Sequence, residues 1–343
     1  MTESNPNPGP QFAFMLAATD TDTQGLSLGK IVWGRFVRHK AAMISAVVLT
    51  LTVILVITSI GVGPIPGWWM WEPNDIPDLV NNGHPTLEWQ GLWFTLGEHP
   101  FGQDAIGRDV FARTMRGAQV SLMVMVLMGV IATFVGVVIG AFSGFYRGRT
   151  DFFLQRGTEI FIAIPTIVVT AVIGRTVGAA GNPALFGIVL GLLLWPGLAR
   201  LVRADYLSLR EREFVDAARV AGANDRSIMF KHILPNAIGV VIVNATLLMA
   251  TATILEAALS FLGFGIQAPN VSLGNLINEY QNSFSTRPWL FWWPGFFIIV
   301  FALTINLIGD GLRDAFDPRQ RRIPKTKEMN KQAIVKAETE VAQ

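Results

Sequence analysis

Long apolar runs dominate the pattern of hydrophobic and polar positions along the chain. Each run has about 20 residues, enough for a helix to cross a bilayer core of roughly 30 Å. A helix also satisfies its own backbone hydrogen bonds inside lipid. We therefore predict an all-α integral membrane protein with six transmembrane helices, at about residues 41–61, 118–144, 158–178, 184–200, 236–257 and 289–309.

The polar segments between these runs divide the chain further. The first residues contain no Lys or Arg and are rich in Asn, Pro, Thr and Gly, a composition that favours a disordered tail. A basic amphipathic stretch follows, which we expect to lie at the membrane interface. The predicted order is a tail, an interfacial helix with the first span, an outer loop, a core membrane domain with a cytoplasmic loop at 201–235, and a cytoplasmic tail, at 1–29, 30–61, 62–117, 118–310 and 311–343.

The positions of Lys and Arg set the orientation, because cytoplasmic segments carry an excess of both residues. With six spans and the N terminus inside, the inner segments hold 22 of the 27 Lys and Arg residues, and the outer segments hold five. Both basic ends of the chain then lie on one side, which requires an even number of spans. We therefore predict cytoplasmic N and C termini.

One stretch between two apolar runs is unusually polar. Residues 200–231 carry seven Lys or Arg and five Asp or Glu. A charged side chain at the bilayer centre costs about 2.5–3.5 kcal/mol, so this stretch must lie in water, on the cytoplasmic side. Its apolar residues recur at i, i+3, i+4 and i+7, which predicts a helix with one apolar side: Phe214, Ala217, Ala218 and Ala221.

The same stretch contains the signals that end one helix and begin another. Gly222 can take the left-handed conformation that stops the first helix. Asn224 is a good N-cap for a second short helix over 225–233, and Pro235 marks the return to the membrane. Two short helices around a glycine, held at the membrane surface, suit docking into a groove on another protein. A solvated helical loop is the alternative.

Composition excludes several other functions. Hydrophobic residues make up 51% of the chain and charged residues 15%, too apolar for a single soluble core. There is no Cys, and the four His residues show no ligand spacing, so we expect no metal site and no disulfide. The basic balance is explained by the membrane orientation, and we expect no nucleic-acid partner.

The spans also lack the usual means of driving transport. We find no ionisable residue near the middle of a predicted span; Glu159, Arg175, Glu256 and Asp310 fall at or near span ends. Proton-driven carriers and voltage sensors need such residues inside the membrane. The chain has no phosphate loop of its own, so uphill transport would need energy from another protein. An intramembrane enzyme is disfavoured because the spans hold no His/Asp/Glu cluster.

The pattern Asp216-Ala217-Ala218-x3-Gly222-x12-Pro235 resembles the EAA loop of ABC importer permeases, with Asp216 in place of the usual Glu. In that family the loop inserts into the ATPase subunit and transmits its closure. The resemblance implies that the ATPase-coupling residues of this chain are Glu213, Phe214, Asp216, Ala217, Ala218, Ala221, Gly222, Asn224 and Asp225.

Further segments resemble the C-type permease subunit of dipeptide and oligopeptide importers. They include the N-terminal region 28–57 and the run from His99 to Leu122, which resembles a His-x-x-Gly-Thr-Asp-x-x-Gly-Arg-Asp pattern with Gln103 in place of Thr. The resemblance covers about residues 28–322 and implies the type I ABC importer permease fold in the inner membrane of a prokaryote. Nickel importers share much of it.

The resemblance also implies partners. Such permeases pair with a second related permease subunit as a heterodimer, and together they bind two cytoplasmic ATPase subunits and an external substrate-binding protein. ATP and Mg²⁺ would be used by the ATPases, so this chain would bind no cofactor and catalyse no reaction. The expected cargo is a short peptide. A nickel chelate or another cargo, or a stand-alone secondary transporter or channel, are the alternatives.

Two further groups of residues are candidates for a site. Polar residues on the fifth span could line a pathway, although hydroxyls that bond back onto their own helix are a common alternative: Asn244, Thr246, Thr251 and, at the outer end, Glu256. An interfacial carboxylate is the alternative role for Glu256. In the outer loop, Asp104, Arg108 and Asp109 could contact an external partner or lock the loop onto the membrane domain.

Overall fold

The structure is a computed structural model that describes residues 28–90, 93–176 and 181–317. The two predicted tails therefore lie almost entirely outside the described residues. Their predicted boundaries were drawn slightly too wide, because residues 28 and 29 belong to the first helix and residues 311–316 to the last. The described chain is mostly helical, with two short two-stranded sheets near one end.

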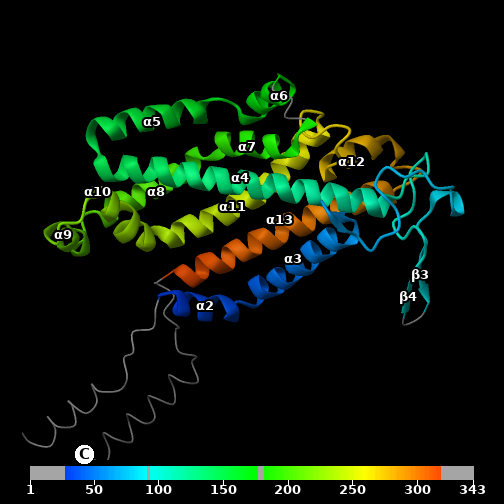
Figure 1. Cartoon of the computed structure of the whole chain (residues 1–343), viewed down its shortest axis with the longest axis horizontal. Coiled ribbons are helices and arrows are strands. Elements are labelled where there is room, and N and C mark those ends of the chain that lie inside the picture. The colour runs from blue at the N-terminus through cyan, green and yellow to red at the C-terminus, as the bar shows by residue number, and fades with distance from the viewer. Residues whose placement is uncertain (1–27, 91–92, 177–180, 318–343) are drawn as a thin grey trace, which may run out of the picture.

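The helices form an elongated bundle around one central member. Helix α4, Val110–Tyr146, runs along the length of the molecule, with α5 and α7 on one side and α11, α13 and α3 on the other (Figure 1). The remaining membrane-domain helices have the following bounds: α2 Leu28–Arg38, α3 Lys40–Ser59, α5 Gly148–Ala163, α6 Thr166–Thr176, α7 Pro183–Leu194, α8 Pro196–Leu209, α11 Leu234–Phe261, α12 Leu273–Tyr280 and α13 Trp289–Phe316.

Four helical stretches of the described residues are long and apolar enough to cross a membrane, and two bent helix pairs raise the number to as many as six. Helices α5 and α6 meet at 79°, and α7 and α8 meet at 46°. Pro165 and Pro196 lie at the two bends. Proline bends a helix because it lacks the backbone N–H donor and its ring clashes with the preceding turn. When each bent pair is one span, the structure agrees with the six predicted spans.

The third span begins earlier than predicted. We expected it to start at residue 158, but α5 begins at Gly148, directly after α4. The charges of Arg149, Asp151 and Arg156 hid this helix from a search for apolar runs. As a consequence Glu159, which we placed at the end of a span, lies well inside α5. Helix α4 is likewise longer than predicted and takes the last eight residues from the predicted outer loop.

Glycines let α8 approach the backbone of α4 closely. Gly136, Gly140 and Gly144 recur every fourth residue and so form one stripe along α4. A Cβ atom built on Gly140 would lie 2.5 Å from the carbonyl oxygen of Ala199, and one on Gly144 would lie 2.7 Å from that of Arg203. Small residues of this kind permit close helix packing in membranes. The stripe therefore explains how α8 sits directly on α4.

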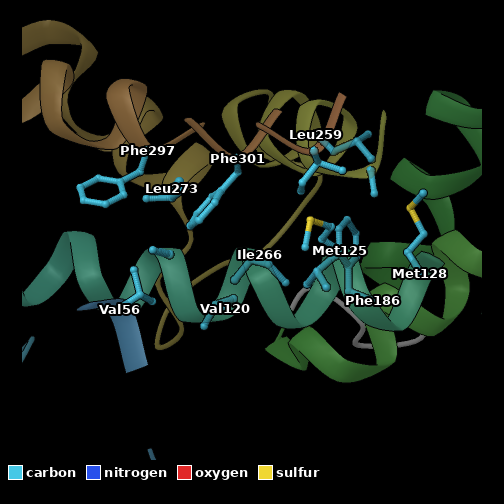
Figure 2. Close-up of a cluster of buried hydrophobic side chains, with 14 of the residues drawn as sticks. Val56, Val120, Met125, Met128, Phe186, Leu259, Ile266, Leu273, Phe297 and Phe301 are labelled. Atoms are coloured by element: carbon cyan, nitrogen blue, oxygen red, sulfur yellow. The ribbon is translucent and has the colours of Figure 1, made fainter. Parts of the chain in front are cut away.

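The largest core cluster lies along the outer half of α4. Figure 2 shows side chains from α3, α4, α7, α11, α12 and α13 gathered over that helix, among them Val56, Met125, Phe186, Leu273 and Phe301. Each of these is at most 6% exposed. A second cluster joins the inner ends of α4 and α8 to the cytoplasmic loop, and it carries the candidate site described below.

The outer loop folds into short elements at the opposite end from the cytoplasmic loop (Figure 1). Its antiparallel pairs and single-turn helices have these bounds: β1 Gly61–Val62 with β2 Ile65–Pro66, β3 Leu87–Gln90 with β4 Trp93–Leu96, η1 Asn81–Gly83, and, after α12, η4 Gln281–Ser283. We did not predict α12. Ser272 caps it by accepting a hydrogen bond from the Asn275 backbone N–H at 3.2 Å.

A buried polar cluster ties this loop to the start of α4. The Asp109 carboxylate caps the helix by accepting from the Ala112 N–H at 2.7 Å, and it also accepts from the Trp69 indole at 3.1 Å. Its second oxygen lies 2.7 Å from Nδ1 of His99, and both side chains are at most 1% exposed. Burial raises the pKa of Asp109, while these hydrogen bonds oppose that shift.

The first helix is clamped against the last. Arg35 of α2 donates to the backbone oxygen of Asp317 at 2.9 Å. His39 accepts from the Ala42 N–H through Nδ1 at 3.1 Å and so caps α3, while its Nε2 lies 3.4 Å from the Asp314 carboxylate. The other face of α2 is open, with Trp33 66% exposed. The predicted helix therefore forms with an open side, and its place at the membrane interface stays a prediction.

The glycine stripe gives a direct test of the packing. Replacing Gly140 by Ala should lower the free energy of unfolding by about 1–3 kcal/mol, because the new methyl group would overlap the backbone of α8. The measurement is unfolding of the purified protein in detergent mixtures titrated with SDS. Gly157→Ala is the matched control, since it lies in a membrane helix with open space around its Cβ position. Equal stability of the two variants would contradict the packing described here.

Candidate functional site

The cytoplasmic loop holds a short helix, α9, Glu213–Val220, that is packed on one side and open on the other. Val215 is fully buried and Ala218 is 7% exposed, and both join the core cluster at the inner ends of α4 and α8. Phe214 is 36% exposed and Val220 90% exposed. These apolar side chains are open to solvent on a helix whose other side is packed, and together they form a surface that another protein can cover.

The division of the apolar residues of α9 between a buried side and an exposed side differs from our prediction. We placed Ala218 on the docking side with Phe214, Ala217 and Ala221, but Ala218 faces inward. The exposed apolar face consists of Phe214, Ala217, Val220 and Ala221, which recur at i, i+3, i+6 and i+7. We missed Val220 and the inward anchor Val215. Spacing alone could not decide which of two neighbouring stripes packs against the rest of the chain.

Gly222 ends α9 as predicted, in a Schellman arrangement. Its φ is +81°, and the N–H of the next residue, Ala223, donates to the Ala218 carbonyl at 3.0 Å. Gly222 itself donates to the Arg219 carbonyl at 2.9 Å. A Cβ atom at Gly222 would meet nothing within 4 Å, so the position is open to a partner. Only the backbone conformation restricts it within this chain.

The second predicted helix also forms, but its geometry changes along its length. Asn224 caps it by accepting from the Ser227 N–H at 2.8 Å. Helix α10, Asp225–Ser227, passes into a π-helical turn, η3, over Ile228–Ile233, and that turn leads directly into α11. π-turns inside helices often occur at functional sites.

The loop is held firmly to the membrane helices. The Tyr206 hydroxyl, on the fully buried side of α8, donates to the Met229 carbonyl at 3.0 Å. Arg210 donates to the Phe145 carbonyl at the end of α4. Ile228, Met229 and Ile233 are fully buried in the same cluster as Val215. Helix α9 is thus attached both to α8 and to the start of α11.

The charged candidates in this loop all point to solvent. Glu213, Asp216 and Asp225 are exposed, and the Asp216 side chain is 70% exposed with Arg219 3.5 Å away. A pair this open contributes little to stability. Their carboxylates are therefore available to a partner. Among the described residues, no three His, Cys, Asp or Glu side chains are grouped as metal ligands would be.

The polar residues proposed to line a pathway bond back onto α11. Asn244, Thr246 and Thr251 donate to the carbonyls of Val240, Ile242 and Leu247, at 2.8, 2.7 and 2.9 Å respectively. This is the alternative that we gave for such residues. Their contact with a moving solute stays a prediction.

Glu256 is neither on an interfacial surface nor in an open space. It is 1% exposed, and its two carboxylate oxygens accept from the hydroxyls of Ser121 and Ser260, both at 2.8 Å. The Ser121 oxygen in turn accepts from the Leu273 N–H at 3.3 Å, which brings α4, α11 and α12 together. The interfacial role that we suggested is wrong for this structure. Sequence could not reveal that the hydroxyls of Ser121 and Ser260 surround this carboxylate.

The outer-loop candidates hold one another. Asp104 accepts from the Arg108 side chain at 2.6 Å, and Arg108 and Arg113 each reach the Glu279 carboxylate, at 2.5 and 2.6 Å. Gln103, the departure from the family pattern, is fully buried and donates to two backbone carbonyls. This geometry favours the loop-locking role for Asp104, Arg108 and Asp109, and contact with an external partner stays untested.

Comparison with known proteins assigns the family. A family model described as the binding-protein-dependent transport system inner membrane component matches residues 136–322, and one described as the N-terminal TM domain of oligopeptide transport permease C matches residues 27–82. A solved structure of the MetNI methionine ABC transporter in inward-facing conformations matches with a TM-score of 0.48 and 20% identity, over 59% of this chain and 95% of that chain.

Curated relatives cover most of the chain. A putative peptide permease protein of Brucella ovis is 40% identical over 83% of this chain and 89% of its own length. The oligopeptide transport system permease protein OppC of Haemophilus influenzae is 37% identical over 87% and 91%, and that of Mycobacterium tuberculosis is 33% identical over 88% and 98%. With its six-span helical architecture, the chain belongs to the family of inner-membrane components of binding-protein-dependent transport systems.

Proposed function

We propose that this chain is the membrane permease subunit of an ATP-driven importer of short peptides, and that α9 couples it to the ATPase. One observation carries this proposal: one face of α9 is apolar and open to solvent, while the opposite side of the same helix is packed against the membrane domain. The names of the relatives, peptide permease and oligopeptide permease, support a peptide cargo.

The proposed assembly contains four kinds of subunit besides lipid. This chain pairs with a second, related permease subunit, two cytoplasmic ATPase subunits bind the loops of the pair, and an external binding protein delivers the peptide. ATP and Mg²⁺ belong to the ATPases, and this chain performs no bond chemistry. Its outer loop, with the locked Asp104–Arg108–Asp109 segment, forms the surface nearest to the binding protein.

The proposed coupling follows from continuity of the helices. Residues Asp225–Phe261 form one helical stretch of 37 residues, about 55 Å long at 1.5 Å per residue. Helix α9 packs on the inner end of this stretch, where Val215 of α9 and Met229 of the stretch belong to one buried cluster. A displacement of α9 by the closing ATPases would therefore act on the inner end of this stretch, and also on α8 through Tyr206.

Gly222 tests the coupling step. Gly222→Trp should leave the protein inserted but uncouple ATP hydrolysis from uptake, because a bulky side chain would stand in the partner's groove on a backbone that disfavours it. The measurement is the ratio of peptide uptake to ATP hydrolysis in proteoliposomes. Gly63→Trp is the matched control, with φ +57° and equally open space, but on the outer side. Normal coupling in the Gly222 variant would refute the proposed role.

Asp216 tests the electrostatic contact. Asp216→Lys should weaken co-purification with the ATPase subunits by about tenfold, roughly 1.4 kcal/mol, because a charge reversed in an interface meets like charge on the partner. Asp216→Glu restores the charge and the usual family residue, so it should assemble normally. Asp75→Lys makes the same charge change on the outer side. Unchanged assembly of the Asp216→Lys variant would remove this residue from the site.

Val220 tests the apolar contact. Val220→Glu should cost about 2 kcal/mol or more in ATPase binding, since it places a charge in the most open part of the apolar face. The stability of the isolated permease should not change, because the side chain is 90% exposed there. Binding of the purified ATPase to the permease in detergent is the measurement, with Val62→Glu on the outer side as the control. Equal affinity of both variants would place the ATPase elsewhere.

A further inference from the structure

A polar cavity lies between α5 and α8, on the cytoplasmic half of the membrane domain. Its volume is about 510 Å³, within the range of small-molecule sites. The lining includes two basic and two acidic side chains with one amide and one aromatic ring: Arg156, Arg203, Asp151, Glu159, Gln155 and Phe152. None of these residues is one of the ATPase-coupling or pathway candidates named from the sequence.

Contacts along α5 fix the position of this helix beside α4. At one end, the Ser143 hydroxyl of α4 donates to Asp151 at 2.5 Å, three residues before α4 ends. At the other end, the ring of Phe161 lies 5.3 Å from that of Trp195, which packs against Ala132, fourteen residues before the end of α4. The cavity lining on α5 runs from Gly148, two residues after the end of α4, to Glu159, which is about 16 Å further along the helix axis.

Two of the four charged side chains in the cavity are bonded to each other. Arg203 holds Asp151 with two hydrogen bonds, at 2.6 and 2.7 Å, and both side chains are less than one third exposed. The Gln155 amide donates to the Ser143 oxygen at 3.0 Å. These groups form a fixed polar wall that joins α5 to α8.

The other two charges are open. Arg156 and Glu159 lie 2.8 Å apart with side chains 66% and 48% exposed. Exposed charges cannot face the hydrocarbon of a bilayer without a large free-energy cost. The exposed apolar surface of α5, which suits contact with lipid, lies on a different side of the helix, where Phe153 is 70% and Ile160 63% exposed. The open pair therefore requires water beside the cavity side of α5.

The chemistry of the open pair fits a zwitterion. The Arg156 guanidinium lies over the Phe152 ring, 5.6 Å from its centroid, which holds the group in place. A guanidinium binds a carboxylate through two parallel hydrogen bonds, and a carboxylate three residues along the helix can accept from an ammonium group. An exposed i,i+3 pair is weak by itself, so a ligand that carries both charges can replace it.

We infer that this cavity is a cytoplasmic-side binding site for a short zwitterionic peptide, with Arg156 binding the peptide carboxylate and Glu159 its ammonium group. The inference rests on the proposed function and names a contact point for its cargo. The peptide would meet this site after passing the middle of the membrane domain, immediately before release to the cytoplasm.

The test uses the purified complex of both permease subunits with the ATPases, without nucleotide and without the binding protein, so that peptide selection elsewhere does not contribute. Equilibrium dialysis measures binding of radiolabelled Ala-Ala and of its N-acetylated, C-amidated form. We expect the wild-type complex to bind Ala-Ala at least tenfold more tightly than the blocked form. Arg156→Gln and Glu159→Gln should each lose this preference.

Two variants control the test. Arg149→Gln removes an exposed charge of α5 outside the cavity lining and should bind as the wild type does. The double variant Arg156→Glu with Glu159→Arg keeps an ion pair and the net charge, and should retain a preference for the zwitterion. Both keep the helix intact, so loss of binding in the single variants would not reflect misfolding.

The outcomes separate the inference from the proposed function. If uptake of Ala-Ala with the binding protein is normal but Arg156→Gln and Glu159→Gln bind like the wild type, the cavity is not the site and the importer assignment stands. If these variants lose the second permease subunit instead, the cavity is a subunit contact and the inference is overturned. If the wild-type assembly takes up no peptide, the proposed function fails together with the inference.

Discussion

A charged side chain has no favourable place in the hydrocarbon of a bilayer, and this constraint organises the whole chain. It separates a basic cytoplasmic side from a sparsely basic outer side. It forces the charged stretch between α8 and α11 into water, where a helix with one apolar face can remain open. It also requires water beside Arg156 and Glu159 of α5, because both side chains are charged and exposed.

Close backbone packing complements that constraint. Apolar side chains gain little by associating in lipid, so helices hold together through small residues and hydrogen bonds. Gly136, Gly140 and Gly144 let α8 lie against α4, and this contact places Tyr206 where it can bond to Met229. The cytoplasmic loop is consequently fixed to the membrane domain by its buried side alone. The open side is left entirely for a partner.

Much of this arrangement could be predicted from the sequence, because apolar runs of bilayer length and the bias of Lys and Arg are strong local signals. The caps at Gly222 and Asn224 were predictable for the same reason: each depends on one residue type. The start of α5 was missed because it is rich in charges, two of which, Asp151 and Arg156, line a cavity. The order of residues alone cannot distinguish such a helix face from a polar loop. The inward side of α9 was assigned wrongly because Val215 belongs to a buried cluster with residues distant in sequence, Phe145 of α4 among them.

The hydrogen bonds of Glu256 are the clearest example of a feature that the spacing of residues in the sequence cannot reveal. They also determine how the outer end of α11 is held. The helical stretch from Asp225 carries α9 at its inner end and Glu256 near its outer end. The Glu256 carboxylate is bonded to Ser121 of α4, which also accepts from the first residue of α12. Moving the outer end of α11 would therefore break or shift buried hydrogen bonds, which is costly. The inner end can move more readily, because the π-helical turn at Ile228–Ile233 departs from regular α-helical bonding. The stretch is thus held rigidly at its outer end and is irregular at its inner end, where it meets the coupling loop. A displacement of α9 would therefore move the inner end more easily than the outer end.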